Sequence, residues 1–301
     1  MEIVIGSEKN GFEYSKDVLI YLIQKIFPGI NIVNKNDDTC DIIVSSNNWG
    51  TSDSDRWNRI LKNYIYFSGE SYFPPLSQYH KDYIYILTTL CEEENYLYVP
   101  FFLLSPHLYL NRKYTNNNRP YLLAYCNGNP IKEGQEMFNI FVEKTSVSTC
   151  HSFNCYGNYP ETKQPKIEGS WSTSEIIDTY KNYKFIIAME NIQKDGYVTE
   201  KIINAFYSGA IPIYWGASNV NEFFNKKAFI NVSDFNTFED CVEYVINMTD
   251  EEITAMLNEP IYMQDNDIVN LLNDEYNKKG NKTLDIYMSK IKKIIELKTN
   301  V

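Results

Sequence analysis

The chain has 301 residues, which exceeds the usual size of a single hydrophobic core, so we expect two domains. Hydrophobic residues make up 44% of the sequence and aromatic residues 15%, which is enough apolar surface to order a globular chain and excludes general disorder. The formal net charge of −11 argues against a general nucleic-acid binder, because such proteins attract phosphates through excess positive charge. An anionic ligand would therefore need a local positive site.

Charged side chains interrupt the apolar stretches near the start of the sequence, so we expect neither a secretory signal nor a transmembrane segment. The six cysteines are spread thinly along the chain; they are Cys40, Cys91, Cys126, Cys150, Cys155 and Cys241. Sparse cysteines without a signal peptide indicate reduced thiols and predict a cytoplasmic location.

In the first part of the chain, short apolar runs alternate with patterns of helical spacing. A helix is predicted at 13–27, where Pro28 and Gly29 end it. The apolar runs predict strands at 2–5, 30–33, 41–44 and 64–67. Strands that alternate with helices favour a parallel sheet, so the predicted fold class is α/β.

The polar stretch Tyr114–Pro120 interrupts this alternation, so we place a domain boundary there and expect domains at residues 1–116 and 117–301. The second domain is predicted to have strands at 121–125, 183–188, 211–215 and 229–232, a loop at 146–169, and helices at 199–208 and 237–248. An amphipathic helix predicted at 282–298 is a candidate to pack across the domains. Two similar α/β halves predict a ligand that lies across the carboxyl ends of both sheets.

Residues 183–216 form the most informative segment, in which a strand, a polar loop and a helix that opens at Thr199 follow one another. Unpaired backbone N–H groups and the positive end of the helix dipole meet at such a helix start, and both favour a bound phosphate. Lys201 lies in the first turn, where a cation opposes the dipole by roughly a few tenths of a kcal/mol unless an anion binds. Residue types alone leave an alternative, an ordinary strand–helix unit in which Lys201 points into water.

Three elements of this segment resemble the donor-binding motif of the α1,3/4-fucosyltransferases, glycosyltransferase family 10. They are Met189-Glu190-Asn191, similar to the family's FEN; Tyr197-Val198-Thr199-Glu200-Lys201, its YVTEK; and Ile211-Pro212-Ile213-Tyr214-Trp215-Gly216, its IPIYWG. The resemblance continues through residues 229–235, which are similar to the family's FVNVHDF. In the first half of the chain, residues 66–70 are similar to its FYTGE.

This resemblance implies a GT-B fold, in which two Rossmann-like domains face a central cleft. The N-terminal domain would bind the acceptor, and the C-terminal domain would bind GDP-fucose. The implied reaction is inverting transfer of L-fucose from GDP-fucose to a hydroxyl of a glycan acceptor, with O3 of N-acetylglucosamine as the expected position. No cofactor is implied, and a divalent metal is not expected to be essential.

The resemblance also implies roles for individual residues. Glu70 would be the catalytic base that takes the acceptor proton, with a glutamate that caps a turn as the alternative. Lys201 would stabilise the negative charge that develops on the departing diphosphate. The implied donor-binding residues are Glu190, Asn191, Tyr197, Thr199, Glu200 and Lys201.

One departure from the family pattern lies in the first helix of the donor domain. The family has an arginine there that meets the diphosphate, whereas this sequence has Gly134 or Gln135. Lys132 is nearby, but a lysine lacks the fork that grips two phosphate oxygens. This departure supports one alternative function, a non-catalytic carbohydrate- or nucleotide-binding module. A glycosyltransferase that uses another nucleotide sugar is the second alternative.

Two other patterns contain residue types that bind metals. Residues 53–55 have the D-x-D form, but they precede a predicted helix, where aspartates serve as caps. Cys150, His151 and Cys155 have no second pair of ligands at a workable spacing, so zinc is not expected. The sequence therefore predicts no metal site.

Overall fold

The computed structural model of the chain contains two compact units. We call Met1–Pro100 with Asn270–Val301 the N-terminal unit, and Phe101–Val269 the C-terminal unit. The structure describes residues 2–7, 29, 31–35, 42–46, 64–68, 84–87, 96–98, 101–104, 119–126, 131–145, 150–153 and 174–263.

The C-terminal unit begins at Phe101, so the division that we expected after residue 116 falls inside it. The short helix η3, Phe101–Leu104, makes the tertiary contacts that account for this difference. The backbone N–H of Phe102 donates to the carbonyl of Val198 over 3.0 Å. The ring of Phe102 is fully buried, with its centroid 5.5 Å from that of Phe223 and 5.0 Å from that of Phe224.

The N-terminal unit contains a six-stranded parallel sheet in the order β2-β1-β3-β4-β5-β6. Its strands are β1 (Glu2–Ser7), β2 (Asn31–Lys35), β3 (Ile42–Ser46), β4 (Tyr64–Ser68), β5 (Ile84–Leu87) and β6 (Tyr96–Tyr98). The four strands predicted in this part of the sequence are confirmed as β1 to β4. The sequence analysis did not predict β5 and β6. The helices predicted at 13–27 and 282–298 lie outside the described residues.

The C-terminal unit contains a five-stranded parallel sheet in the order β11-β10-β9-β7-β8. Its strands are β7 (Tyr121–Cys126), β8 (Cys150–Phe153), β9 (Tyr183–Met189), β10 (Ile211–Trp215) and β11 (Ile230–Asn231). The predicted strands are confirmed, but the loop expected at 146–169 is wrong where it includes β8. Among the described strands, β8 pairs with β7 alone, in the register Leu123↔Cys150, so tertiary pairing rather than local pattern places it in the sheet.

The direction of the sheet order reverses between β7 and β9. From β7 the chain passes through helix α2 to β8 at one edge, and then returns through helix α3 to β9 on the other side of β7. In open parallel sheets, ligands bind outside the carboxyl ends of the strands at such a reversal. We therefore expect a ligand of this unit to bind beyond the carboxyl ends of β7 and β9.

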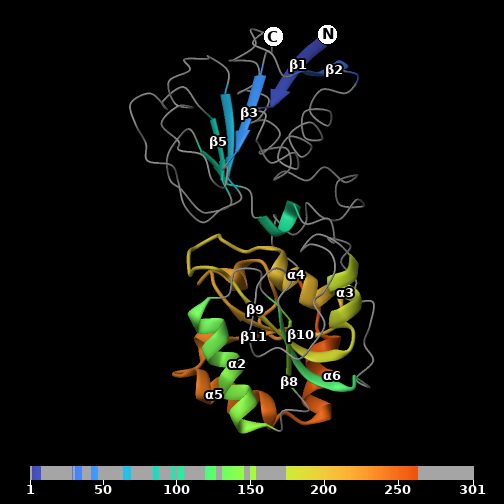
Figure 1. The fold of residues 1–301 in the computed structure, drawn as a ribbon, viewed down its shortest axis with the longest axis vertical. Helices are drawn as coiled ribbons and strands as arrows, with labels where there is room; N and C mark the ends of the chain where they lie inside the picture. Colours follow the sequence, from blue (N-terminus) through green and yellow to red (C-terminus); the bar gives the residue numbers. More distant parts are fainter. Residues whose placement is uncertain are drawn as a thin grey trace. The chain divides into compact units, whose positions relative to one another are not determined.

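Helices cover both faces of this sheet (Figure 1). Helices α2 (Lys132–Lys144), α5 (Phe238–Ile246) and α6 (Asp250–Asn258) pack on one face, where Leu123 and Phe185 join their core. Helices α3 (Ser174–Tyr180) and α4 (Glu200–Tyr207) pack on the other, with Ala124 and Ile186. Neighbouring residues of a strand point to opposite faces, which is why an apolar run rather than an alternating pattern marks β9.

Arg119 is a buried cation at the start of β7, with 7% of its surface exposed. Its guanidinium donates to the carbonyls of Tyr180 over 3.2 Å, Tyr183 over 2.9 Å and Ser208 over 2.8 Å. These bonds join the start of β7 to the end of α3, the start of β9 and the end of α4. Arg119, which lies in the polar stretch where we placed the domain boundary, therefore anchors β7 to three other elements of the fold.

Cys126, at the end of β7, is disulfide-bonded, so the expectation of reduced thiols is wrong at this position. Disulfides persist in oxidising compartments and are rare in the cytosol. The cytoplasmic location, which was drawn from sparse cysteines without a signal peptide, stays a prediction.

Cys241 on α5 is a free and fully buried thiol, and burial raises its pKa to about 12. Because the thiolate is the reactive form, we expect iodoacetamide at about pH 8 to leave Cys241 unmodified in the folded protein and to alkylate it after unfolding in guanidinium. Peptide mass spectrometry measures both outcomes. Rapid labelling of Cys241 in the folded chain would show that α5 opens.

Candidate functional site

The loop from Glu190 to Thr199 joins β9 to α4 at the reversal of the sheet order. Thr199 is the N-cap of α4, and its hydroxyl accepts from the backbone N–H of Lys201 over 3.4 Å. Helix α4 begins at Glu200, which confirms the helix predicted to open at Thr199 and places Lys201 in its first turn. The positive end of the helix dipole therefore lies at the carboxyl edge of the sheet.

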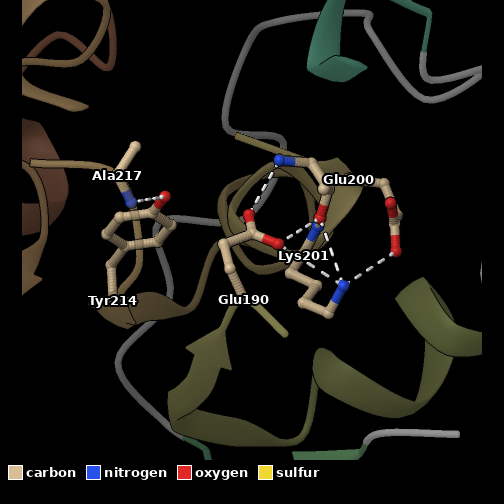
Figure 2. A network of polar contacts seen from close by, with 6 residues as sticks. Glu190, Glu200, Lys201, Tyr214 and Ala217 are labelled. Carbon is tan, nitrogen blue, oxygen red and sulfur yellow. Dashed lines mark hydrogen bonds and ion pairs between the residues drawn. The ribbon is translucent and has the colours of Figure 1, made fainter. Parts of the chain in front are cut away.

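A buried carboxylate organises this helix start (Figure 2). Glu190 has 0% of its surface exposed. One of its oxygens accepts from the backbone N–H of Thr199 and the other from the Thr199 hydroxyl, each over 2.7 Å. The second oxygen also lies 3.4 Å from the ammonium nitrogen of Lys201. Both oxygens of Glu190 are thus occupied by the helix that carries the candidate phosphate-binding lysine.

Lys201 lies between two carboxylates. Its ammonium nitrogen is 3.4 Å from Glu190 and 3.7 Å from Glu200, and it also donates to the Thr199 hydroxyl over 3.3 Å. Burial alone would lower the pKa of Lys201, but the charges of Glu200 and Glu190 outweigh it and hold the pKa above its ordinary value. Burial raises the pKa of Glu190, while Lys201 and the bonds from Thr199 act against that shift. Lys201 therefore remains a cation at neutral pH.

Hydrogen bonds from the next loop brace the 190–199 loop. The backbone N–H of Gly196, which has a φ of 78°, donates to the side-chain oxygen of Asn219 over 2.8 Å. The Ser218 hydroxyl donates to Asp195. At the other end, the backbone N–H of Glu190 donates to the carbonyl of Trp215 over 2.8 Å. The loops after β9 and β10 thus support one another.

Gly216 makes room for Glu190. A methyl group added at Gly216 would lie 2.6 Å from Cγ of Glu190 and 2.5 Å from the hydroxyl oxygen of Tyr214. That hydroxyl accepts from the backbone N–H of Ala217 over 3.1 Å, which fixes the turn after β10 (Figure 2). The glycine that ends the IPIYWG element is therefore a close-packing position beside the buried carboxylate.

The predicted donor-binding residues differ in their access to solvent. Asn191 is exposed, and the side chains of Glu200 and Lys201 keep 12% and 18% of their surface exposed. The remaining three, Glu190, Tyr197 and Thr199, are buried. The sequence predicted these residues as one site, and the structure brings them together in one loop and helix start. The sequence did not predict which of their side chains face inward. Glu70 lies outside the described residues, as do residues 53–55 and Cys155.

The departure from the family pattern falls in the first turns of α2, which follows β7. A methyl group at Gly134 would lie 2.3 Å from the hydroxyl oxygen of the fully buried Tyr125, so an arginine does not fit there unless Tyr125 moves. Gln135 donates from its side-chain nitrogen to Asn139 over 2.9 Å, and Lys132 is exposed. Of these candidates, Lys132 is the cation next to the reversal point.

Gly134→Ala is expected to lower the free energy of unfolding by about 1 kcal/mol. Overpacking a core position costs about 1–3 kcal/mol, which exceeds the ~1 kcal/mol that alanine gains over glycine inside a helix. Urea unfolding measures the change, and Glu136→Ala on the exposed side of α2 is the control. A stabilised Gly134→Ala variant would show that Tyr125 yields without cost.

Clusters of metal-ligating side chains and membrane-spanning helices are both absent from the part of the chain that the structure describes. Three or more His, Cys, Asp or Glu side chains do not group there as ligands for an ion. None of the helices described is both long and apolar enough to cross a bilayer.

Residues 136–257 match the family model for the C-terminal domain of glycosyltransferase family 10, the fucosyltransferases. The chain is 44% identical over 89 residues to the putative fucosyltransferase R654 of Acanthamoeba polyphaga mimivirus, and 52% identical over 63 residues to the α1,3-fucosyltransferase FucT of Helicobacter pylori. It is 35% identical over 72 residues to the mouse 4-galactosyl-N-acetylglucosaminide 3-α-L-fucosyltransferase 9. These segments cover 29%, 21% and 23% of this chain but only 15%, 13% and 20% of those proteins.

Solved structures resemble the chain over nearly its whole length. An α1,3-fucosyltransferase solved with GDP matches 98% of this chain and 90% of its own, with a TM-score of 0.66 and 19% identity. The same enzyme type solved with GDP-fucose gives a TM-score of 0.65 at 20% identity, covering 98% of this chain and 91% of its own. A glycosyltransferase from Rickettsia africae gives 0.53 at 11% identity, covering 99% of this chain and 98% of its own. At these identities the likeness concerns the fold, which is GT-B, as the resemblance implied.

Proposed function

We propose, from the match of residues 136–257 to the family model of the fucosyltransferases, that this chain is an inverting fucosyltransferase that uses GDP-fucose as donor. One observation carries the proposal. A lysine ammonium lies in the first turn of α4, at the reversal point of the sheet, inside the segment that matches the family. A helix start with a fixed cation at this position suits a nucleoside diphosphate.

In the proposed reaction, Lys201 stabilises the leaving group. The bond between the fucose anomeric carbon and the diphosphate breaks while negative charge builds up on the departing GDP. A preorganised cation and a helix dipole stabilise that charge more in the transition state than in the ground state, which accelerates the chemical step. Glu200, whose oxygens accept hydrogen bonds, would bind hydroxyls of the donor sugar, and Asn191 and Tyr197 would lie beside it.

The acceptor oxygen attacks the anomeric carbon from the face opposite GDP, so the configuration inverts. We propose a glycan with N-acetylglucosamine as acceptor and O3 as the attacking oxygen. The H. pylori and mouse relatives, an α1,3-fucosyltransferase and an N-acetylglucosaminide 3-fucosyltransferase, support this choice. We further propose that a divalent metal is not essential, because Lys201 supplies positive charge at the diphosphate site; full activity in EDTA is the expected result.

The direct test incubates the full chain with GDP-fucose and N-acetyllactosamine acceptors, and measures released GDP together with the product linkage by NMR. Fucosylated product with inverted anomeric configuration is expected. A thermal-shift series with GDP-fucose, GDP-mannose and UDP sugars identifies the donor, because stabilisation grows as RT ln(1 + [L]/Kd). Absence of product and of stabilisation by every guanine nucleotide would refute the proposal.

Glu70→Gln is expected to remove most turnover and to leave GDP binding within about twofold, because the amide cannot take the acceptor proton. Initial rates and calorimetric GDP titrations measure the two quantities.

The departure at Gly134 and Gln135 favours a non-catalytic nucleotide-binding module as the second candidate function. Such a module would bind GDP in wild type and in Glu70→Gln, and would show no turnover in either. An unchanged rate in Glu70→Gln would instead remove Glu70 from the mechanism.

A further inference from the structure

We infer that Glu190 is a positioning residue, which holds Lys201 and the start of α4 in place for the donor diphosphate without touching the donor. This inference rests on the proposed function and adds a role for a residue that the reaction itself does not use. The role differs from donor binding, which the sequence resemblance implies for Glu190.

The first argument is access. Glu190 has 0% of its surface exposed, and its two oxygens already accept from the N–H and the hydroxyl of Thr199. Its Cγ sits where a methyl on Gly216 would lie only 2.6 Å away, so the carboxylate has little room to turn outward. A ligand therefore meets Lys201 and Glu200, which keep exposed surface, rather than Glu190.

The second argument is connectivity. The backbone N–H of Glu190 donates to the carbonyl of Trp215 at the end of β10. Its side chain accepts from the N-cap residue Thr199 and lies beside the ammonium of Lys201 on α4. The carboxylate is thus a fixed point on the sheet from which the helix start is held. Side chains that orient the groups in contact with a ligand are needed for binding geometry, although they lie one layer behind it.

The third argument is competition for the lysine. Lys201 has two carboxylate neighbours, at 3.4 Å from Glu190 and 3.7 Å from Glu200. Without the charge of Glu190, the flexible ammonium would pair with Glu200 alone, which is the carboxylate proposed to bind the donor sugar. Glu190 therefore keeps Lys201 near the helix start and leaves Glu200 available for the ligand.

The effect of Glu190→Gln separates positioning from simple electrostatics. The substitution keeps the side-chain shape and removes one negative charge beside Lys201. On charge alone, it would strengthen the binding of an anion. Positioning predicts the opposite, a loss of GDP affinity on the order of tenfold, because the lysine and the helix cap lose their shared anchor.

The experiment is a double-mutant cycle on the full chain, with GDP affinity measured by calorimetry for wild type, Glu190→Gln, Lys201→Met and the double variant. If Glu190 acts through Lys201, the double variant binds GDP no more weakly than Lys201→Met alone. Additive losses, or an unchanged or tighter affinity in Glu190→Gln, would overturn the inference. Circular dichroism and thermal unfolding establish that each variant is folded.

Two further variants complete the design. Gly216→Ala keeps the charge of Glu190 but pushes against its Cγ, and is also expected to weaken GDP binding, which covers the case in which Glu190→Gln does not fold. The matched control is Glu243→Gln, an exposed carboxylate on α5 that pairs with Lys144, and it is expected to bind GDP as wild type does. Wild type that fails to bind GDP would refute the proposed function and this inference together. Wild type that binds GDP and depends on Lys201, with additive losses in the cycle, would refute the inference alone.

Discussion

Lys201→Ala is expected to lower kcat/KM for fucose transfer by at least tenfold. In the proposed reaction, the variant lacks the cation beside the departing diphosphate, which corresponds to about 2–3 kcal/mol of transition-state stabilisation. Initial rates at varied GDP-fucose concentration give the value. Lys184→Ala is the control, because Lys184 lies on β9 and pairs with the exposed Asp250 over 3.1 Å.

The same substitution also tests the electrostatics of the helix start. Without Lys201, the buried carboxylate of Glu190 loses its cation, and leaving one member of a buried ion pair alone costs about 3–5 kcal/mol of stability. Rates must therefore be measured well below the unfolding temperature of the variant. A folded Lys201→Ala protein with the wild-type kcat/KM would remove Lys201 from the proposed mechanism.

Arg119→Met is expected to lower the free energy of unfolding by about 3 kcal/mol or more. The variant keeps much of the volume of the side chain, but it leaves the carbonyls of Tyr180, Tyr183 and Ser208 without the donors that Arg119 supplies. Each hydrogen bond from a charged group contributes about 1.5–3 kcal/mol. Urea unfolding followed by fluorescence measures the loss as a shift of the midpoint.

The control for this prediction is Lys226→Met, which removes a cation from an exposed position of the same unit and is expected to change stability by less than about 0.5 kcal/mol. If the two variants unfold at the same urea concentration, the three carbonyls must find other donors in Arg119→Met. The anchoring role of the guanidinium would then be wrong.

The sequence pattern predicted those parts of the fold in which the residues that interact are close together in the sequence. The apolar run of β9, the N-cap Thr199 and the first-turn Lys201 are all adjacent in the sequence, so their arrangement follows from strand and helix rules. The resemblance favoured a phosphate-binding role for Lys201 over the alternative in which it points into water. Together they located the loop that carries the candidate site.

The misses arise from contacts between residues far apart in the sequence. Arg119 stands in a polar stretch that indicates a linker, and only the carbonyls of α3, β9 and α4 turn it into a buried anchor. Phe102 belongs to the C-terminal unit because its backbone bonds to Val198 and its ring packs against those of Phe223 and Phe224. The motif likewise gives the residue type of Glu190 but not its burial, which depends on its bonds to Thr199 and its packing beside Gly216.

The acceptors of Arg119 lie 61, 64 and 89 residues further along the chain. During synthesis, Arg119 therefore leaves the ribosome well before Ser208 does. Contacts between residues so far apart in the sequence form late in folding. A nascent chain that ends before Ser208 cannot complete this network. We expect ribosome-bound chains of the C-terminal unit to resist protease only once α4 and the residues after it have emerged.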